Sequence, residues 1–199
     1  MTTTTNFRTA DHAIDPLFLD RWSPRAFKDE AISDADLMSM FEAARWAPSS
    51  YNSQPWRFVY TKRDSISWEL FLGLLNPFNQ SWAKNSAALV FLVSNPMMRA
   101  PGAEEDVPSR SHSFDAGAAW TSLALQAARL GLQAHAMVGV DFDKAASDLG
   151  VPADFRIEVA IAIGRPGDKA QLPEGLQARE LPSPRKPLAE IVSEGRYAF

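Results

Sequence analysis

One long helical segment is apolar on nearly every side, and it limits the possible folds more than any other stretch. It starts at Ser113 or Asp115, and from Ala116 to Leu130 it carries mainly alanine, leucine and tryptophan, with Gly131 at the position where helices commonly end. A helix of this composition must be covered all round. We therefore expect it at the centre of the molecule.

Two further apolar runs predict interior strands. Ala87 to Val93 is too short for a buried helix and is rich in valine, leucine and phenylalanine. In the run from Phe155 to Ile163, the residues at 157, 159, 161 and 163 are isoleucine or valine and are expected to share one face, with alanine on the other. Strands are also expected at 57–61 and 133–138.

Capping residues mark three more helices. Ser33 begins an amphipathic segment with its apolar residues at helical spacing. Asp64 is expected to cap a second helix that Asn76-Pro77 ends, and Asp141 a third that stops at Gly150.

Two stretches lack a periodic pattern. Between Asn95 and His112, prolines, a glycine and an acidic run predict a long loop without regular structure, which is either functional or disordered. After Gly164 the chain becomes rich in proline and charge. A tail with so little apolar content gains little by folding onto its own subunit, so it is a candidate to wrap a partner.

Composition excludes several classes of function. The 199 residues are 46% hydrophobic, which suits one domain spanning 1–199, and the net charge of -4 has no basic cluster suited to nucleic acid or membrane. No cysteine is present, so disulfides, thiolate nucleophiles and cysteine-bound metals are excluded and any redox chemistry must come from a bound cofactor. The N-terminal residues 1–8 have no apolar signal region, and we expect a cytoplasmic protein.

Familiar catalytic and nucleotide-binding motifs are missing. The sequence has no G-x-G-x-x-G, no phosphate-binding P-loop and no G-x-S-x-G. His12, His112 and His135 are too far apart for a local metal motif, so no metal site and no catalytic side chain is expected. His135 lies in an apolar strand and is expected to be a hydrogen-bonded core residue.

A polar loop lies between two prolines, Pro48 and Pro55. Three serines, a tyrosine, an asparagine and a glutamine follow one another without a charge: Ser49, Ser50, Tyr51, Asn52, Ser53 and Gln54. Such groups suit a planar heteroaromatic ligand that offers both donors and acceptors. An ordinary capped turn is the alternative, because serine and asparagine favour turns wherever they occur.

A second polar element runs from Arg21 to Arg25, as Arg-Trp-Ser-Pro-Arg. Pro24 disfavours a helical Ser23, which leaves both guanidinium groups on an irregular turn. Two arginines and a hydroxyl can hold a phosphate, since guanidinium matches phosphate oxygens with paired hydrogen bonds. Two solvated arginines beside a turn are the alternative.

Together these two elements resemble those of the nitroreductase family of flavin-dependent oxidoreductases. That family carries Arg-x-Ser-x-Arg/Lys early in the chain and Pro-Ser-Ser-x-Asn-x-Gln-Pro-Trp about 25 residues later, here at 48–56. The resemblance continues over nearly the whole chain, through these positions: Asp115, Gly117, Leu130-Gly131-Leu132, Val138-Gly139 and Arg185-Lys186-Pro187-Leu188.

The resemblance implies an α+β fold in which helices flank a mixed, mainly antiparallel sheet and a long central helix forms a homodimer interface. It implies an FMN-dependent enzyme that passes electrons from NADH or NADPH to a small electron-poor acceptor, such as a nitroaromatic, quinone or enal, in ping-pong order. The cofactor-binding residues that it implies are Arg21, Trp22, Ser23, Arg25, Pro48, Ser49, Ser50, Asn52, Gln54, Asn79, Val138, Gly139, Arg185 and Lys186, with Tyr51 toward the substrate.

Within that set the roles differ. Arg21 and Arg185 would hold the phosphate, with Lys186 as a second candidate, and Arg25 would face the flavin N1 and C2 carbonyl. Ser49, Ser50 and Asn52 would reach the flavin from the opposite subunit, and Val138 and Gly139 would lie beside N5. Asn79 would contact the pyrimidine ring, or would instead cap a helix. Trp82 stands where the family often has a basic residue.

Other functions stay open on the sequence alone. A flavin-binding sensor or carrier without turnover would share the same motifs. So would a specialised enzyme of the same fold, such as a dehalogenase or a flavin-fragmenting enzyme. An unrelated binder of apolar ligands is the remaining alternative.

Overall fold

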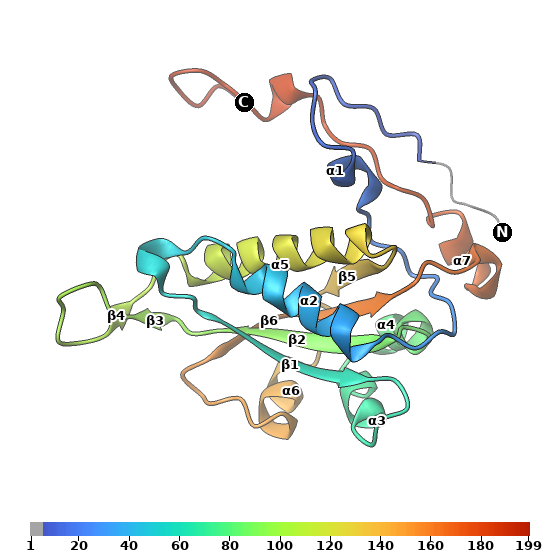
Figure 1. The fold of residues 1–199 in the computed structure, drawn as a ribbon, viewed down its shortest axis with the longest axis horizontal. Coiled ribbons are helices and arrows are strands. Elements are labelled where there is room, and N and C mark those ends of the chain that lie inside the picture. Colours follow the sequence, from blue (N-terminus) through green and yellow to red (C-terminus); the bar gives the residue numbers. More distant parts are fainter. Residues whose placement is uncertain (1–5) are drawn as a thin grey trace.

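The computed structural model describes residues 6–199 and shows a four-stranded antiparallel sheet between two layers of helices (Figure 1). The strands lie in the order β1-β2-β6-β5, and a separate two-stranded ribbon is formed by β3 and β4. The strands are β1 (Trp56–Lys62), β2 (Ala88–Ser94), β3 (Met97–Met98), β4 (Val107–Pro108), β5 (Gln133–Met137) and β6 (Arg156–Gly164). The α+β fold expected from the sequence is confirmed.

Helices cover both faces of the sheet. Buried side chains of α2 and α5 pack on one face, and those of α3, α4, α6 and α7 on the other. The helices are α1 (Leu17–Asp20), α2 (Asp34–Arg45), α3 (Trp68–Leu72), α4 (Pro77–Ala83), α5 (His112–Arg129), α6 (Phe142–Asp148) and α7 (Glu174–Gln177). Among residues 6–199, none of the helices combines the length and the apolar composition that spanning a membrane requires.

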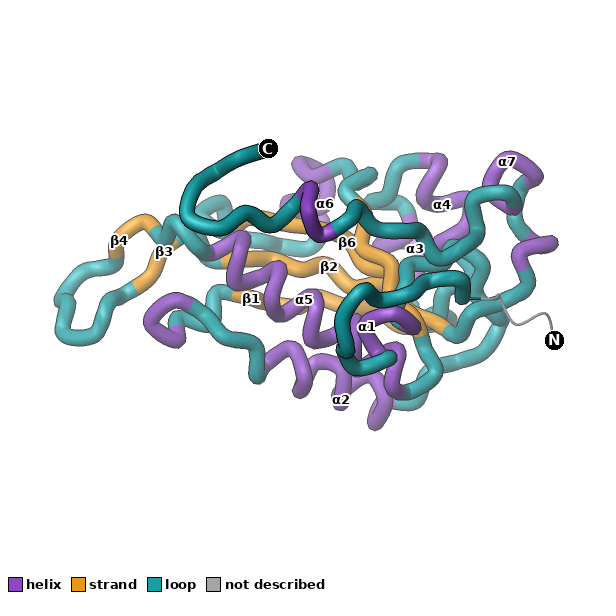
Figure 2. The backbone as a smooth tube through the Cα atoms, turned by 90° about the horizontal axis from the view of Figure 1, so that it is seen from above, coloured by secondary structure: helices purple, strands orange, loops and turns teal. Residues whose placement is uncertain are grey.

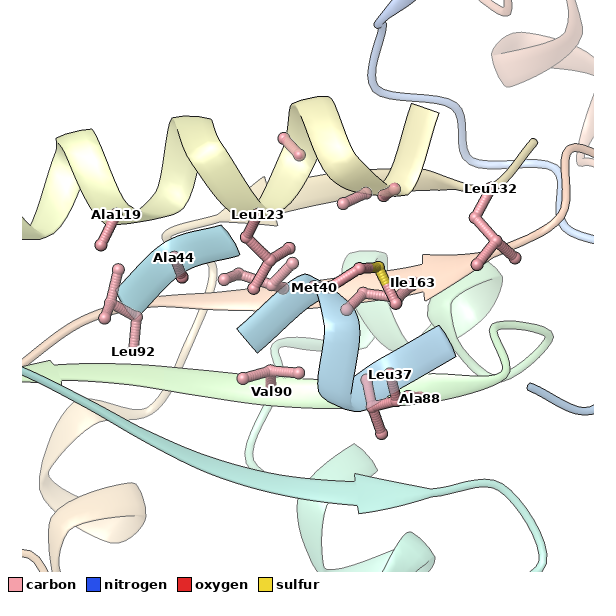
Figure 3. Packing of buried hydrophobic residues seen from close by; sticks show 14 of the residues in the cluster. Leu37, Met40, Ala44, Ala88, Val90, Leu92, Ala119, Leu123, Leu132 and Ile163 are labelled. Atoms are coloured by element: carbon pink, nitrogen blue, oxygen red, sulfur yellow. The ribbon is translucent and has the colours of Figure 1, made fainter. Parts of the chain in front are cut away.

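The α2–α5 layer shows how the apolar pattern becomes a core (Figure 3). Leu37, Met40 and Ala44, spaced three and four residues apart, are fully buried against Leu123 of α5 and the strands beneath. Burying one such leucine or methionine side chain contributes about 1.5–3 kcal/mol. Ser33 starts α2 as expected, because its side chain accepts a hydrogen bond from the Asp36 N–H.

Within a single chain, the helix α5 is not covered all round. Its inner face is buried against α2 and the sheet, whereas Phe114 is 81% exposed, Gly117 and Thr121 are exposed, and Leu125 is half-buried. These four residues are three or four positions apart and form one stripe along the helix. Composition shows that a helix is apolar, but not whether its own chain or another chain covers it.

Asn76-Pro77 begins a helix, although we predicted that this pair ends one. The Asn76 side chain accepts a hydrogen bond from the Asn79 N–H and Pro77 occupies the first turn of α4, where proline's missing N–H costs nothing. The expected cap at Asp64 is also wrong. Asp64 has a φ of 66°, and α3 starts only at Trp68.

The segment expected to lack regular structure contains the β3–β4 ribbon. Met97 pairs with Pro108 and Met98 with Val107, while the proline-, glycine- and acid-rich residues form the tip. Strands of two residues are too short to show a period-two pattern. The same segment leads into α5, which begins at His112, one residue before the earlier of the two expected starts.

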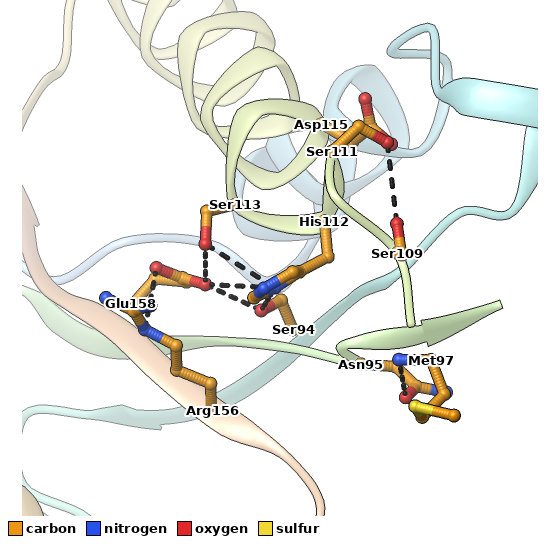
Figure 4. A network of polar contacts seen from close by, with 10 residues as sticks. All are labelled: Ser94, Asn95, Met97, Ser109, Ser111, His112, Ser113, Asp115, Arg156 and Glu158. Carbon is orange, nitrogen blue, oxygen red and sulfur yellow. Dashed lines mark hydrogen bonds and ion pairs between the residues drawn. The ribbon is translucent and has the colours of Figure 1, made fainter. Parts of the chain in front are cut away.

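A bulge in β6 places Ile157 on the face of the sheet opposite to the predicted one. Leu92 pairs with Val159 and Val93 with Ile157, so Glu158 is the extra residue and the side chains before it switch faces. Ile157 therefore packs with the lower layer, whereas Ile161 and Ile163 pack under α5. Glu158 accepts hydrogen bonds from Ser94 and Ser113 at 2.6 and 2.8 Å (Figure 4).

Candidate functional site

The Arg21–Arg25 turn is held beside the end of the sheet by Gln133, the first residue of β5. Its amide accepts a hydrogen bond from the Trp22 N–H at 3.1 Å and donates one to the Asp20 carbonyl at 3.1 Å. The helix α1 ends at Asp20, and Arg21 is its C-cap residue. The turn is thus positioned by a strand more than 100 residues later in the chain.

A hollow of about 180 Å³ opens at this turn, and we call it the arginine pocket. It contains four of the residues implied by the resemblance in one turn and a fifth from the tail. The lining residues are Arg8, Arg21, Trp22, Ser23, Arg25, His135, Arg179, Leu181, Ser183 and Arg185. Five arginines around one small hollow form a strongly positive site.

The arginines form no close ion pairs. Among the described residues, none of the five forms an ion pair within 4.0 Å. Burial lowers the pKa of Arg21, and the nearby Arg185 lowers it further. Burial and the charges of Arg185 and Arg21 also lower the pKa of Arg8. Like-charged guanidinium groups held this close together favour an anionic ligand.

Arg8 and the tail residues Arg179 and Ser183 complete the pocket, although no sequence pattern predicted them. Arg8 donates to the carbonyls of Ser183, Leu19 and Arg21 at 2.9, 3.0 and 2.8 Å, which ties the N-terminal segment and the tail to the turn. Figure 2 shows these two segments passing near each other over α1. Neither Arg8 nor Arg179 stands in a motif.

His135 is the hydrogen-bonded core residue that was expected, and it also lines the pocket. Its Nδ1 lies 2.8 Å from the Pro24 carbonyl, and its ring lies 4.7 Å from that of Trp82. Burial lowers its pKa to about 4, and the Pro24 hydrogen bond opposes this only in part. At neutral pH it is therefore uncharged and adds nothing to the positive charge.

The serine–asparagine loop, residues 48–54, is built around a short 3-10 helix at Ser50–Asn52. The Ser49 hydroxyl accepts from the Gln54 N–H at 3.0 Å, and the Asp115 carboxylate accepts from the Ser50 N–H at 3.1 Å. Tyr51, Asn52 and Gln54 have φ values of 50°, 54° and 46°, in the left-handed region that non-glycine residues rarely adopt. This strained backbone presents Tyr51, Asn52 and Gln54 to solvent.

Helix α5 separates the serine–asparagine loop from the arginine pocket. Asp115, which holds the loop, lies in the first turn of α5, whereas Gln133, which holds the arginine turn, follows its end. The 18 residues of α5 span about 27 Å at 1.5 Å per residue. Within one chain the two groups of site residues therefore do not meet, and they lie toward opposite ends of the helix in Figure 1.

Asn79, Val138 and Gly139 form a third group, around the turn that follows β5. Asn79 is 7% exposed and its amide donates to the Gly139 carbonyl at 3.2 Å. A Cβ at Gly139 would approach the Asn76 and Asn79 amides to 2.4 and 2.3 Å, so only glycine fits. Val138 is 70% exposed. The residue that caps α4 is Asn76, so the alternative prediction that Asn79 caps a helix is wrong.

Two further residues lie outside these groups. Trp82 is 1% exposed and packs between Phe27 and His135, so it is a core residue that links α4 to the pocket wall. Lys186 lines an adjoining hollow instead of the arginine pocket, and its ammonium lies 3.9 Å from Glu190.

The arginine pocket and its neighbours fit the phosphate and ring of a flavin mononucleotide. The pocket offers guanidinium groups and the Ser23 hydroxyl without a competing carboxylate on the hollow, and the side-chain Nε of Arg25 is buried without a hydrogen-bond partner. Phosphate accepts several such donors at once. The exposed Val138 leaves the adjacent β5–α6 turn open to a planar group.

A sequence profile of the nitroreductase family matches residues 19–165. The chain belongs to the nitroreductase family. A solved structure described as an oxidoreductase containing FMN is 48% identical, with a TM-score of 0.93 and 99% of each chain covered. A nitroreductase structure from Desulfovibrio desulfuricans in complex with FMN is 26% identical, with a TM-score of 0.69, covering 94% of this chain and 100% of that one.

A relative from Streptomyces coelicolor is named as a candidate NADH dehydrogenase/NAD(P)H nitroreductase. It is 27% identical over 169 residues, which cover 75% of this chain and 81% of that protein. Family membership and the FMN-containing neighbours identify the chain as an oxidoreductase of the nitroreductase family.

Proposed function

We propose that the protein binds FMN between two subunits and passes electrons from NADH or NADPH to a small electron-poor acceptor. One observation carries this proposal: the arginine pocket and the serine–asparagine loop lie at opposite ends of α5. Each is too incomplete to bind a flavin alone. A two-fold dimer in which the helices run antiparallel would bring the loop of one subunit to the pocket of the other.

The exposed surface supports a dimer. The chain exposes 11,845 Å² at a mass of 22.0 kDa, whereas a compact monomer of this mass is expected to expose about 9,300 Å². The excess of about 2,500 Å² is what one subunit of a large obligate interface buries. The open stripe of α5 and the exposed end of the tail, residues 183–199, are the surfaces that we assign to it.

In the assembled site each group has a separate task. Arg21, Arg185 and Ser23 would bind the phosphate, and Arg25 would place a positive charge at the flavin pyrimidine edge. Ser49, Ser50 and Asn52 of the partner loop would bind the ring, and the Gly139 backbone would lie beside it. Lys186 is left as a residue of the adjoining hollow.

Bound flavin supplies two-electron transfer, so the chain's own residues need only bind, orient and polarise it. No dinucleotide fingerprint occurs in the sequence to hold NAD(P)H apart from the acceptor. Both substrates would therefore use the exposed face beside Val138 in turn. Steady-state rates at several acceptor concentrations should then give parallel double-reciprocal lines.

The test begins with the visible spectrum of the purified protein and mass identification of the released flavin. We expect FMN, because one phosphate-sized basic pocket is present, and bleaching of the flavin band by NADH or NADPH under nitrogen. Released FAD would contradict the arginine-pocket assignment. Bound FMN that neither nucleotide reduces would favour a sensor or carrier.

A further inference from the structure

Glu180 lies directly behind the arginine pocket and is buried to 2% exposure, although it comes from the charged tail. Its Oε1 accepts two backbone hydrogen bonds, from the Arg25 N–H at 2.6 Å and from the Ala26 N–H at 2.7 Å. Its Oε2 has no hydrogen-bond partner among the described residues. A carboxylate this buried is rare unless it serves a particular neighbour.

That neighbour is Arg25. The Nε of Arg25 is also buried without a hydrogen-bond partner. Burial lowers the pKa of Arg25, and the negative charge of Glu180 partly reverses this. Glu180 therefore does two things: it fixes the backbone that carries Arg25, and it offsets part of the positive charge that Arg25 brings to the site.

We propose that Glu180 is a positioning residue that lowers the reduction potential of the bound flavin through its effect on Arg25. This inference rests on the proposed function, in which Arg25 faces the flavin pyrimidine edge. Uptake of two electrons and one proton leaves that edge with one more negative charge than before. A cation beside it favours the reduced form, and a buried carboxylate behind the cation reduces this preference.

The substitution Glu180→Gln isolates the charge, because the glutamine carbonyl can still accept both N–H groups. We expect Glu180→Gln to raise the ratio of the affinities for reduced and oxidised FMN about tenfold over the wild-type ratio. For a two-electron couple this raises the midpoint potential of the flavin by about 30 mV. The midpoint is measured on the FMN-loaded protein by titration against a reference dye. Glu174→Gln, an exposed glutamate of α7, is the matched control and should leave the midpoint unchanged.

Glu180→Ala separates position from charge. It removes the acceptor as well, so the Arg25 turn loosens and we expect oxidised and reduced FMN both to bind more weakly. A residue with a merely structural role would weaken FMN binding in Glu180→Ala but would not move the midpoint in Glu180→Gln. Arg25→Gln should move the midpoint in the opposite direction, downward.

The outcomes are distinct. A loaded Glu180→Gln protein with the wild-type midpoint overturns this inference and leaves the proposed function standing. A wild-type protein that takes up no FMN overturns both. If Glu180→Gln does not fold, the Arg25→Gln midpoint decides: a lower value supports the inference, and an unchanged value overturns it.

Discussion

The arginine pocket is assembled from segments at both ends of the sequence, whereas the serine–asparagine loop is a single stretch. In both, a buried carboxylate accepts backbone N–H groups: Glu180 behind the Arg25 turn and Asp115 behind Ser50. Arg25 and Glu180 are 155 residues apart in the sequence, whereas Ser50 and Asp115 are only 65 apart. The pocket's charge comes from side chains, and the loop's shape comes from three left-handed residues.

This difference predicts how substitutions in each region should affect ligand binding. In the proposed site the pocket would bind through several like charges gathered in one place, so the loss of one charge would weaken binding but leave the others. The loop would bind through neutral groups on a strained backbone, so its contribution would depend on shape. Substitutions in the two regions should therefore differ in size and in kind.

The largest expected effect comes from mixing subunits. In the proposed homodimer Arg21→Ala and Asn52→Ala would each damage both sites, but a heterodimer of the two variants would have one intact site and one doubly damaged site. We expect mixing after mild denaturation and refolding to restore about half of the wild-type FMN binding in the heterodimer, as follows from symmetry. Unrecovered binding in an isolated, differently tagged heterodimer would place both half-sites in one chain.

The next effect is on stability and concerns His135. Because its folded pKa of about 4 lies below the ordinary 6.5, the unfolded chain takes up a proton first as the pH falls. The contribution of neutral His135 to the free energy of unfolding is therefore fully present above about pH 6.5. It is lost as the pH falls toward 4, and the loss is on the order of 3 kcal/mol. Urea unfolding at pH 7 and pH 4.5 should show a smaller difference for His135→Gln, and His12→Gln, an exposed control, should behave as wild type.

A smaller effect separates the two regions in FMN affinity. Arg21→Ala removes a charge-assisted contact, expected to cost roughly 1.5–3 kcal/mol, whereas Asn52→Ala removes a neutral hydrogen bond, at about 1 kcal/mol. Titration of apo-protein with FMN compares them, with Arg110→Ala, an exposed arginine, as the control. Equal losses would leave the phosphate role of Arg21 unsupported.

The smallest effect tests the strain in the loop. Tyr51 is 64% exposed at a φ of 50°, and a left-handed residue costs roughly 1–2 kcal/mol that glycine avoids, against about 0.5–1 kcal/mol of added chain entropy. Tyr51→Gly should therefore stabilise the protein by roughly 0.5 kcal/mol. A clear loss of stability in thermal unfolding would mean that the Tyr51 ring supports the loop.

The sequence predicted the elements whose signals are local. The caps at Ser33 and Asp141, the interior strands and the loop between Pro48 and Pro55 all carry their signal within a few residues. The fold class followed from them together with the family resemblance. Asn76-Pro77 was misread because the same pair can follow one helix or start another.

The remaining parts of the site could not be predicted because they depend on contacts distant in the chain. Glu180 looks like any charged tail residue until the tail returns to Arg25, and Arg8 gains a role only beside Ser183. The face of the sheet on which Ile157 lies depends on a bulge at Glu158, and the alternation of apolar residues in the sequence does not indicate that bulge. The open stripe of α5 likewise depends on which surfaces the chain itself covers.

The distance in sequence between Arg25 and Glu180 also orders events during synthesis of the protein. The serine–asparagine loop can form once α5 has been made, because Asp115 is the most distant residue that holds it. The arginine pocket cannot close until the residues around Glu180 and Ser183 have been added, and closing so long a loop is slow and entropically costly. Cofactor capture should therefore be among the last steps of maturation, and a chain arrested before Glu180 should fold its sheet yet remain colourless.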